Sequence, residues 1–390
     1  MPDRAKTLVL EADGYGWQRI LADTTLHGLF NKKETEGIKR QMQKTRLAKW
    51  SREVYEHQSY MIDWREAVCQ SSDLNVTVCN INNLIDYARI RRRIKDYDLI
   101  IILHSAAGDD LSILLKTSRW FANRRGKLVA FIGNEYDLMS QKIDLLLQLR
   151  ADYICSQLPI KTAQWIYSEC QNTKILEMPH ALNPTVYQVD PGAFRAKDVG
   201  FRGAIYPYFI GDIERNKLVE FFCLNANALN LNCDIENYKM HRTEWARFLN
   251  TCKGIIGAEA GTYFLDHKGQ AVTSAKRYLR KHPKTSFEEL YHRYFEPLTD
   301  YMSGKAISSR HFEPIGTKTC QLLLEGEYNG ILKADQHYIC IKNDLSNIDD
   351  VVRRFKDADY RRKIVEDTYQ YVMDSHTYHH RVAKLIKAVL

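Results

Sequence analysis

A short stretch in the C-terminal third of the chain combines a carboxylate, small residues and a cation at a spacing that suits a nucleotide. Glu313 precedes Gly316, Thr317 and Lys318, and we expect a helix to begin at this glycine and continue through Gln321–Leu324. The unpaired N–H groups and the positive partial charge of a helix N-terminus favour a diphosphate. The hydroxyl of Thr317 would add a hydrogen-bond donor, and the ammonium of Lys318 would add positive charge. Glu313 would accept hydrogen bonds from ribose hydroxyls. An ordinary capped helix with a surface carboxylate explains the same residues equally well.

Further donor-side candidates lie at the start of the second half. Arg202 and Gly203 follow a strand-like run, and Arg215 comes early in the next helical segment. A glycine after the first strand of a Rossmann unit lets a ligand approach the backbone, and a guanidinium can bind phosphate with two hydrogen bonds. A salt bridge to a nearby carboxylate is the simpler explanation of each arginine. His180 follows a strand-ending proline, which fits a donor-facing role or a turn contact.

The first half offers three candidates for a catalytic base. Asp13 follows the first strand-like run, His104 ends the third, and Glu135 follows the fourth. Transfer with inversion needs a carboxylate or histidine that deprotonates the acceptor hydroxyl, and Asp13 is the first choice. The pair Gly14-x-Gly16 is a weak phosphate signal because the third glycine of the dinucleotide motif is absent. His104 has the alternative interpretation of a hydrogen bond within the strand end.

Two series of strands and helices must position these residues. The apolar, β-branched runs that we expect to be strands are 7–10, 75–78, 99–103, 127–132, 153–155 and 175–178, then 198–201, 230–233, 254–256, 330–332 and 338–341. Most are apolar throughout rather than alternating, as in a parallel sheet that is buried on both faces. Intervening helical segments then predict an α/β protein with two Rossmann-like domains that face each other across a cleft.

Turn-rich segments suggest where the domains divide. We expect an N-terminal domain at 1–190, with a charged helical insert at about 26–70, and a C-terminal domain at 195–375. The last helix, 376–390, is expected to join the N-terminal domain. The insert could cover the acceptor or be a plain pair of surface helices.

Composition limits the class of protein. Hydrophobic residues make up 45% and charged residues 27%, and no apolar run reaches the ~20 residues that span a bilayer. The N-terminus shows no secretory signal and the nine cysteines form no Cys-x-x-Cys pair, so we expect a cytoplasmic protein without a disulfide framework or zinc site. The net charge of +8 allows anionic partners, including a membrane surface on its inner face, but its weak clustering argues against nucleic acid.

The C-terminal motifs resemble a known family. The run Arg310-His-Phe-Glu313, then Gly316-Thr317, then Glu325-Gly-Glu-Tyr-x-Gly330 and His337-Tyr338 is similar to the donor domain of bacterial GT-B glycosyltransferases of the group 1 type, including the spore-maturation-like branch. Weaker similarities extend the resemblance to about three quarters of the chain, outside the insert. The resemblance implies a glycosyltransferase that moves a sugar from a UDP- or GDP-linked donor to a hydroxyl on a glycan, lipid-linked or protein acceptor, without a required metal or other cofactor.

One position departs from the family pattern. Many retaining members carry two glutamates eight residues apart, and Lys305 stands eight residues before Glu313. The resemblance therefore implies a ribose-binding role for Glu313 and donor contacts for Arg310, but leaves the grip on the donor sugar and the stereochemistry open. A nucleotide-sugar epimerase of the same architecture and a non-catalytic sugar-binding subunit remain alternatives.

Overall fold

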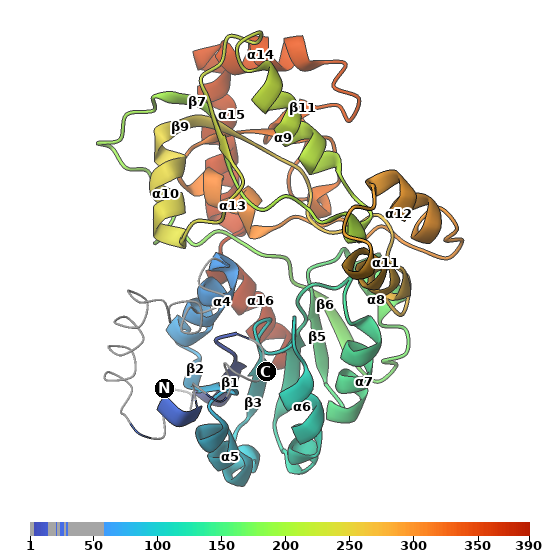
Figure 1. Ribbon diagram of the computed structural model, residues 1–390. Helices are drawn as coiled ribbons and strands as arrows, with labels where there is room; N and C mark the ends of the chain where they lie inside the picture. The colour runs from blue at the N-terminus through green and yellow to red at the C-terminus, as the bar shows by residue number, and fades with distance from the viewer. Residues whose placement is uncertain (1–3, 15–20, 22–23, 27–28, 30–57) are drawn as a thin grey trace. The chain divides into compact units, whose positions relative to one another are not determined.

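The computed structural model describes two compact units of the chain (Figure 1), over residues 4–14, 21, 24–26, 29 and 58–390. Unit 1 comprises Met1–Ser156, Ala163–Glu177 and Lys384–Leu390, and unit 2 comprises Gln157–Thr162 and Met178–Ala383. The expected boundary at 190–195 therefore lies inside unit 2. Most of the expected helical insert at 26–70 lies outside the described residues.

Unit 1 is built on a parallel sheet of six strands in the order β2-β1-β3-β4-β5-β6. Its strands are β1 (Ala5–Glu11), β2 (Leu74–Asn80), β3 (Leu99–Ile102), β4 (Lys127–Phe131), β5 (Tyr153–Ser156) and β6 (Lys174–Glu177). The central strands are apolar because helices cover both faces, and every residue of β3 is 0% exposed. The covering helices are α4 (Ser59–Gln70), α5 (Leu84–Arg93), α6 (Ser112–Thr117), α7 (Met139–Leu149) and α8 (Ile160–Ile166).

Unit 2 contains a second parallel sheet, of five strands in the order β11-β10-β9-β7-β8. Its strands are β7 (Lys197–Arg202), β8 (Cys233–Glu236), β9 (Cys252–Gly257), β10 (Cys320–Leu324) and β11 (Ile339–Ile341). The helices are α9 (Glu214–Asn225), α10 (Arg242–Thr251), α11 (Gln270–Lys281), α12 (Phe287–Tyr294), α13 (Ser309–Gly316), α14 (Ile348–Lys356) and α15 (Ala358–Ser375). The last helix, α16 (Tyr378–Val389), begins in unit 2 and belongs to unit 1 from Lys384 onward.

Two hydrophobic clusters bury the unit 2 sheet. One packs Trp245 of α10 and Phe312 of α13 against the sheet residue Leu323. The other packs Phe222 of α9 and Phe355 of α14 against the sheet together with β7 and β11 residues. The two clusters contain alternate residues of β10, because successive side chains of a strand point to opposite faces of the sheet. The sheet therefore lies between two helical layers, and the loops at the ends of its strands can carry the polar groups of a site.

Two expected elements of the second half are wrong. The run Gln321–Leu324 is part of strand β10 and pairs with β9 and β11, although a helix was expected there. All five residues of β10 are buried, and a short apolar run that is buried on both faces looks alike in a strand and in a core helix. Residues 330–332 follow a tight turn, Tyr328–Gly330, in which Asn329 and Gly330 have positive φ, instead of forming a strand.

Candidate functional site

Each sheet has one topological switch point. In unit 1 the chain leaves β1 for β2 on one side and returns to β3 on the other, and in unit 2 it leaves β7 for β8 and returns to β9. Loops that follow two such strands diverge, and the crevice between them, at the carboxyl ends of the strands, is where α/β proteins bind ligands. The residues after β7 and β9 are therefore the first place to look for a site in unit 2.

The N-terminus of α13 lies at the end of β9. The segment before the helix pairs with the loop after β9 through two backbone hydrogen bonds of 2.9 Å between Ala260 and Ala306. His311, in the first turn of α13, adds a side-chain bond of 3.0 Å from Nε2 to the carbonyl oxygen of Ala258. The unpaired N–H groups at the start of this helix are thus held next to the switch point, where a helix N-terminus favours an anion.

The protonation of His311 follows from its two partners. The backbone N–H of Ser308 can only donate, and it lies 3.0 Å from Nδ1, so Nδ1 carries no proton. Nε2 then carries the proton and donates to Ala258. Burial lowers the pKa of His311 to about 4, so the neutral ring that this geometry requires is the stable form at neutral pH.

Glu313 lies one turn into α13 and is buried against α10. Its Oε2 accepts a hydrogen bond of 2.7 Å from Nε1 of Trp245 and lies 3.7 Å from Nε of Arg310. The guanidinium of Arg310 in turn stacks 4.5 Å above the Trp245 ring, and its side chain is 32% exposed. A carboxylate, an indole and a guanidinium thus form one cluster beside the first turn of the helix, and the donor-binding roles of Arg310 and Glu313 stay predictions.

The loop after β7 presents a second cation. Arg215, in the first turn of α9, donates from Nη2 to the carbonyl oxygen of Ala204 at 2.5 Å and lies 3.4 Å above the ring of Tyr206. Asn216 fixes the loop further, because its side-chain amide bonds both the N–H and the carbonyl of Tyr206, at 2.8 and 2.9 Å. Arg215 is therefore held at the β7 side of the switch point, and its binding of phosphate stays a prediction.

Lys305 forms a buried charge cluster with the loop before α9. Its Nζ lies 2.5 Å from Oδ2 of Asp212 and 3.4 Å from Oε2 of Glu214, and both Lys305 and Asp212 are buried. It also lies 4.5 Å above the ring of Tyr263, whose hydroxyl donates to Glu214 at 3.0 Å. Burial alone would lower the pKa of Lys305, but the two carboxylates raise it, so the ammonium stays charged. A cation thus fills the position at which the family resemblance led us to look for a glutamate.

Glu259 connects the ends of β9 and β10. Its carboxylate accepts the backbone N–H groups of Glu327 at 3.2 Å and Tyr328 at 2.7 Å, and a side chain on Gly326 would collide with it. Burial raises the pKa of Glu259 in spite of these bonds. We assign Glu259 to the support of the loop rather than to ligand contact, because its acceptors are already used inside the protein.

Gly316, Thr317 and Lys318 do not begin a helix. They lie where α13 ends, so the partial charge there is negative and repels a diphosphate. The expected helix N-terminus at these residues is wrong, and the observed one lies at Ser308 and Ser309. Gly316 instead allows close packing, because a Cβ there would collide with the carbonyl oxygen of Tyr187.

The side chains of the other two residues are also engaged. Thr317 is 0% exposed and donates to the carbonyl oxygen of Pro314 at 3.0 Å. Lys318 has a positive φ of 52° and pairs with Glu366 at 2.7 Å. Sequence reasoning missed the true start of α13, and the signal was the Ser308-Ser309 pair, which offers a helix cap just before His311.

Arg202 and His180 lie in internal contacts. Arg202 is 5% exposed and binds Asp234 on β8 at 2.6 Å, with its guanidinium 4.1 Å above the Phe248 ring. It therefore points along the sheet and joins β7 to β8 instead of facing the switch point. His180 is buried in unit 2, next to Pro179, whose carbonyl oxygen accepts a hydrogen bond from Arg381.

The three expected base candidates lie at one edge of the unit 1 sheet. Asp13, His104 and Glu135 follow the neighbouring strands β1, β3 and β4, and the first two flank the switch point of this sheet. The backbone N–H of Ala12 donates to Oγ of Ser105 at 3.1 Å, which ties the two loops together. Asp13 is partly exposed, whereas the other two are buried.

Burial decides what His104 and Glu135 can do. His104 lies among the rings of Tyr60, Trp64 and Phe131, and burial lowers its pKa to about 3. Glu135 accepts two short hydrogen bonds on one oxygen, from Ser156 at 2.7 Å and from Tyr167 at 2.6 Å. Asp13 is therefore the most exposed of the three candidates.

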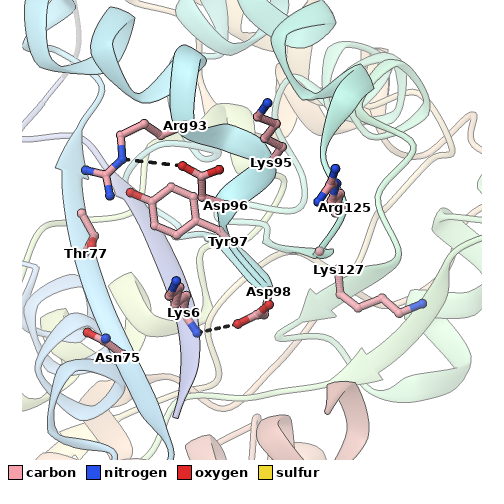
Figure 2. Close-up of a pocket in the computed structure, with 11 residues that line it drawn as sticks. Lys6, Asn75, Thr77, Arg93, Lys95, Asp96, Tyr97, Asp98, Arg125 and Lys127 are labelled. Carbon is pink, nitrogen blue, oxygen red and sulfur yellow. Dashed lines mark hydrogen bonds and ion pairs between the residues drawn. The ribbon is translucent and has the colours of Figure 1, made fainter. Parts of the chain in front are cut away.

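Other kinds of site are less evident. Among the residues that the structure describes, no three His, Cys, Asp or Glu side chains are placed to hold a metal ion. None of the described helices is long and apolar enough to cross a membrane. A hollow of about 710 Å³ opens at the amino edge of the unit 1 sheet, away from the three base candidates (Figure 2).

The C-terminal part of the chain is similar to a known protein family. Residues 262–387 match a family model described as glycosyl transferase-like, and this region includes Lys305, α13 and Glu313. No curated protein sequence matches the chain.

Solved structures resemble the chain over its whole length. The sucrose-phosphate synthase of Thermosynechococcus elongatus aligns over 99% of this chain and 98% of its own, with a TM-score of 0.52 at 7% identity. HepE of Anabaena, in complex with UDP-glucose, gives a TM-score of 0.48 at 9% identity over 99% and 100% of the two chains. A glycosyltransferase of Rickettsia africae gives a TM-score of 0.49 at 10% identity, over 99% of this chain and 98% of its own. The first likeness, with the two parallel sheets, confirms the expected fold of two Rossmann-like domains.

Proposed function

We propose that this chain, a glycosyltransferase with two Rossmann-like domains, takes its sugar from a nucleoside diphosphate donor that binds in unit 2 and passes it to a hydroxyl acceptor. The observation that carries the proposal is the bond from His311 to Ala258, which fixes the N-terminus of α13 at the end of β9. The diphosphate would lie against the N–H groups of Ser309 and Arg310, where the helix favours negative charge.

Arg215 and the Arg310–Glu313 pair complete this proposed site. Arg215 would contribute a guanidinium to the diphosphate from the β7 side of the switch point. Glu313 would accept hydrogen bonds from ribose hydroxyls. Because Glu313 is 1% exposed, the side chains of Trp245 and Arg310 would have to move aside first. The leaving diphosphate would then be stabilised by the helix terminus and arginine rather than by a bound metal.

The sugar of the donor would meet a cation rather than a second glutamate. Lys305 presents a charged ammonium with Asp212 and Glu214, so the hydroxyls of the sugar would face these two carboxylates and the hydroxyl of Tyr263. On the acceptor side, unit 1 would supply Asp13 as the base. The nucleotide of the donor would be UDP or GDP.

Binding and turnover test the proposal together. We expect UDP or GDP to bind in calorimetry and Glu313→Gln to weaken that binding, while the matched change Glu366→Gln at an exposed position leaves it unchanged. With an accepted donor sugar, product analysis by NMR should show transfer or slow hydrolysis. Failure of both nucleotides to bind would refute the donor site, and conversion of the donor to a different nucleotide sugar would identify an epimerase instead.

A further inference from the structure

The hollow at the amino edge of the unit 1 sheet is lined by an excess of positive charge. Its walls come from β1, β2, the turn after α5, and the starts of β3 and β4 (Figure 2). The lining includes five cations, Lys6, Arg93, Lys95, Arg125 and Lys127, against the two carboxylates Asp96 and Asp98. Its volume of about 710 Å³ lies within the range of small-molecule sites.

The two carboxylates are already used inside the protein. Oδ2 of Asp98 accepts the backbone N–H of Lys6 at 2.8 Å, and Asp96 lies 3.8 Å from the guanidinium of Arg93. Within the described part of the chain, the side chains of Lys6, Lys95 and Arg125 have no carboxylate partner. These three cations line one concave surface without a carboxylate partner among the described residues, and five cations against two carboxylates give the surface a positive potential.

A buried hydroxyl in the lining has no hydrogen-bond partner. Tyr97 is 5% exposed, and among the described residues no group bonds its hydroxyl. Figure 2 shows the ring in the middle of the lining, with the hydroxyl directed toward Arg93 and Thr77. An unpaired buried hydroxyl costs about 1–3 kcal/mol, and most buried polar groups in proteins avoid it. An anion that displaced the Arg93 side chain would provide the missing acceptor.

The shape of the surface limits its partner. A concave hollow cannot lie flat on a bilayer, and a second copy of a chain with net charge +8 offers no general charge complement. Arginine and lysine together suit phosphate groups, since a guanidinium binds phosphate with two hydrogen bonds and an ammonium binds it as a point charge. A compact ligand with several phosphate groups fits both the charge and the shape.

We infer that this hollow is a second binding site, separate from the base candidates at the opposite edge of the sheet, for a compact soluble ligand with three or more phosphate groups. Lys95 and Arg125 supply its unpaired cations, with Lys6, and Tyr97 supplies a neutral donor. The site does not depend on the proposed donor site in unit 2, because every residue of its lining belongs to unit 1.

Calorimetry with inorganic tripolyphosphate tests this site. The titration uses the full chain with the proposed donor site saturated by UDP or GDP, at about 0.15 M salt, where screening suppresses diffuse attraction. We expect one equivalent to bind and the double variant K95A/R125A to bind about tenfold or more weakly. The matched variant K281A/K284A removes two exposed cations of unit 2 and should bind as the wild type does.

Four results would overturn the inference. Equal losses in K95A/R125A and K281A/K284A would show non-specific attraction, and no binding of tripolyphosphate at all would leave the hollow without the proposed ligand. Binding of phosphatidylglycerol vesicles that K95A/R125A abolishes, without tripolyphosphate binding, would identify a membrane contact instead. Y97F should fold normally and bind more weakly than wild type, and an unchanged affinity would contradict a built site with Tyr97 as donor.

Discussion

His311 donates a hydrogen bond of 3.0 Å from Nε2 to the carbonyl oxygen of Ala258, and thereby fastens the first turn of α13 to the end of β9. The bond joins the helix N-terminus to the switch point of the unit 2 sheet. The tautomer of His311 is fixed as well, because its Nδ1 accepts the backbone N–H of Ser308. The geometry of the proposed donor site therefore depends on a buried neutral imidazole.

Replacing this histidine should damage both the fold and the site. His311→Leu leaves the carbonyl of Ala258 and the N–H of Ser308 without partners, which costs about 1–3 kcal/mol for each buried group. We expect a lower free energy of unfolding in urea and weaker binding of UDP or GDP. His292→Leu, at an exposed position, is the control. An unaltered affinity in a folded His311→Leu would show that the bond does not position the helix.

Acidification should destabilise the protein through its buried histidines. Burial lowers the folded-state pKa of His104 to about 3 and of His311 to about 4, below the ordinary value near 6.5. Between pH 6.5 and 4 the unfolded chain takes up protons that the folded chain does not, so stability falls as pH falls, by about 1.4 kcal/mol per pH unit for each histidine.

Urea denaturation at pH 7 and pH 5 measures this loss. A His104→Phe variant should lose less stability between the two pH values than the wild type, because one of the histidines with a lowered pKa is gone. Identical losses would show that His104 titrates normally in the folded protein.

The buried ion pair of unit 2 should be costly to break on one side only. Lys305→Met leaves Asp212 buried without its partner, which typically costs about 3–5 kcal/mol. Adding Asp212→Asn should restore much of that loss, since it removes the unpaired charge. Chemical denaturation of the two single variants and the double variant gives the coupling energy. Additive losses would mean that the two charges do not interact.

A base at Asp13 should affect turnover without affecting the fold. Asp13 is partly exposed, and Asp13→Asn keeps its size while removing its basicity. We expect kcat to fall about 10²–10⁴-fold, the usual contribution of a general base, with the unfolding midpoint unchanged. Glu135→Gln should instead lower the unfolding midpoint, because Glu135 accepts two buried hydrogen bonds. A turnover that survives Asp13→Asn would rule out Asp13 as the base.

The strand–helix series of the first half could be predicted from sequence because its apolar, β-branched runs are bounded by turns and separated by helical segments. Burial on both faces made strands such as β3 and β4 apolar throughout, and that pattern has few alternatives when helices separate the runs. The carboxyl-end positions of Asp13, His104 and Glu135 followed directly, since parallel strands end at one edge.

The start and end of α13 could not be predicted in the same way. Pro314 and Gly316 looked like a turn that precedes a helix, whereas the helix runs through Pro314 and ends at Gly316. The five-residue run of β10 was too short for periodicity to separate strand from helix. Contacts between distant residues, such as Lys305 with Asp212 or Arg202 with Asp234, depend on tertiary packing and carry no local signal.

Arg215 and Lys318 give the most direct test of the proposed donor site. Both are cationic side chains of unit 2, but only Arg215 lies beside the switch point. Arg215 is in the first turn of α9, whereas Lys318 follows the C-terminus of α13 and forms a surface pair with Glu366 that contributes about 1 kcal/mol or less. Calorimetric titration of UDP and GDP into Arg215→Met and Lys318→Met compares them under identical conditions. The account predicts about tenfold weaker binding for Arg215→Met and wild-type affinity for Lys318→Met. Weaker binding by Lys318→Met with normal binding by Arg215→Met would contradict it.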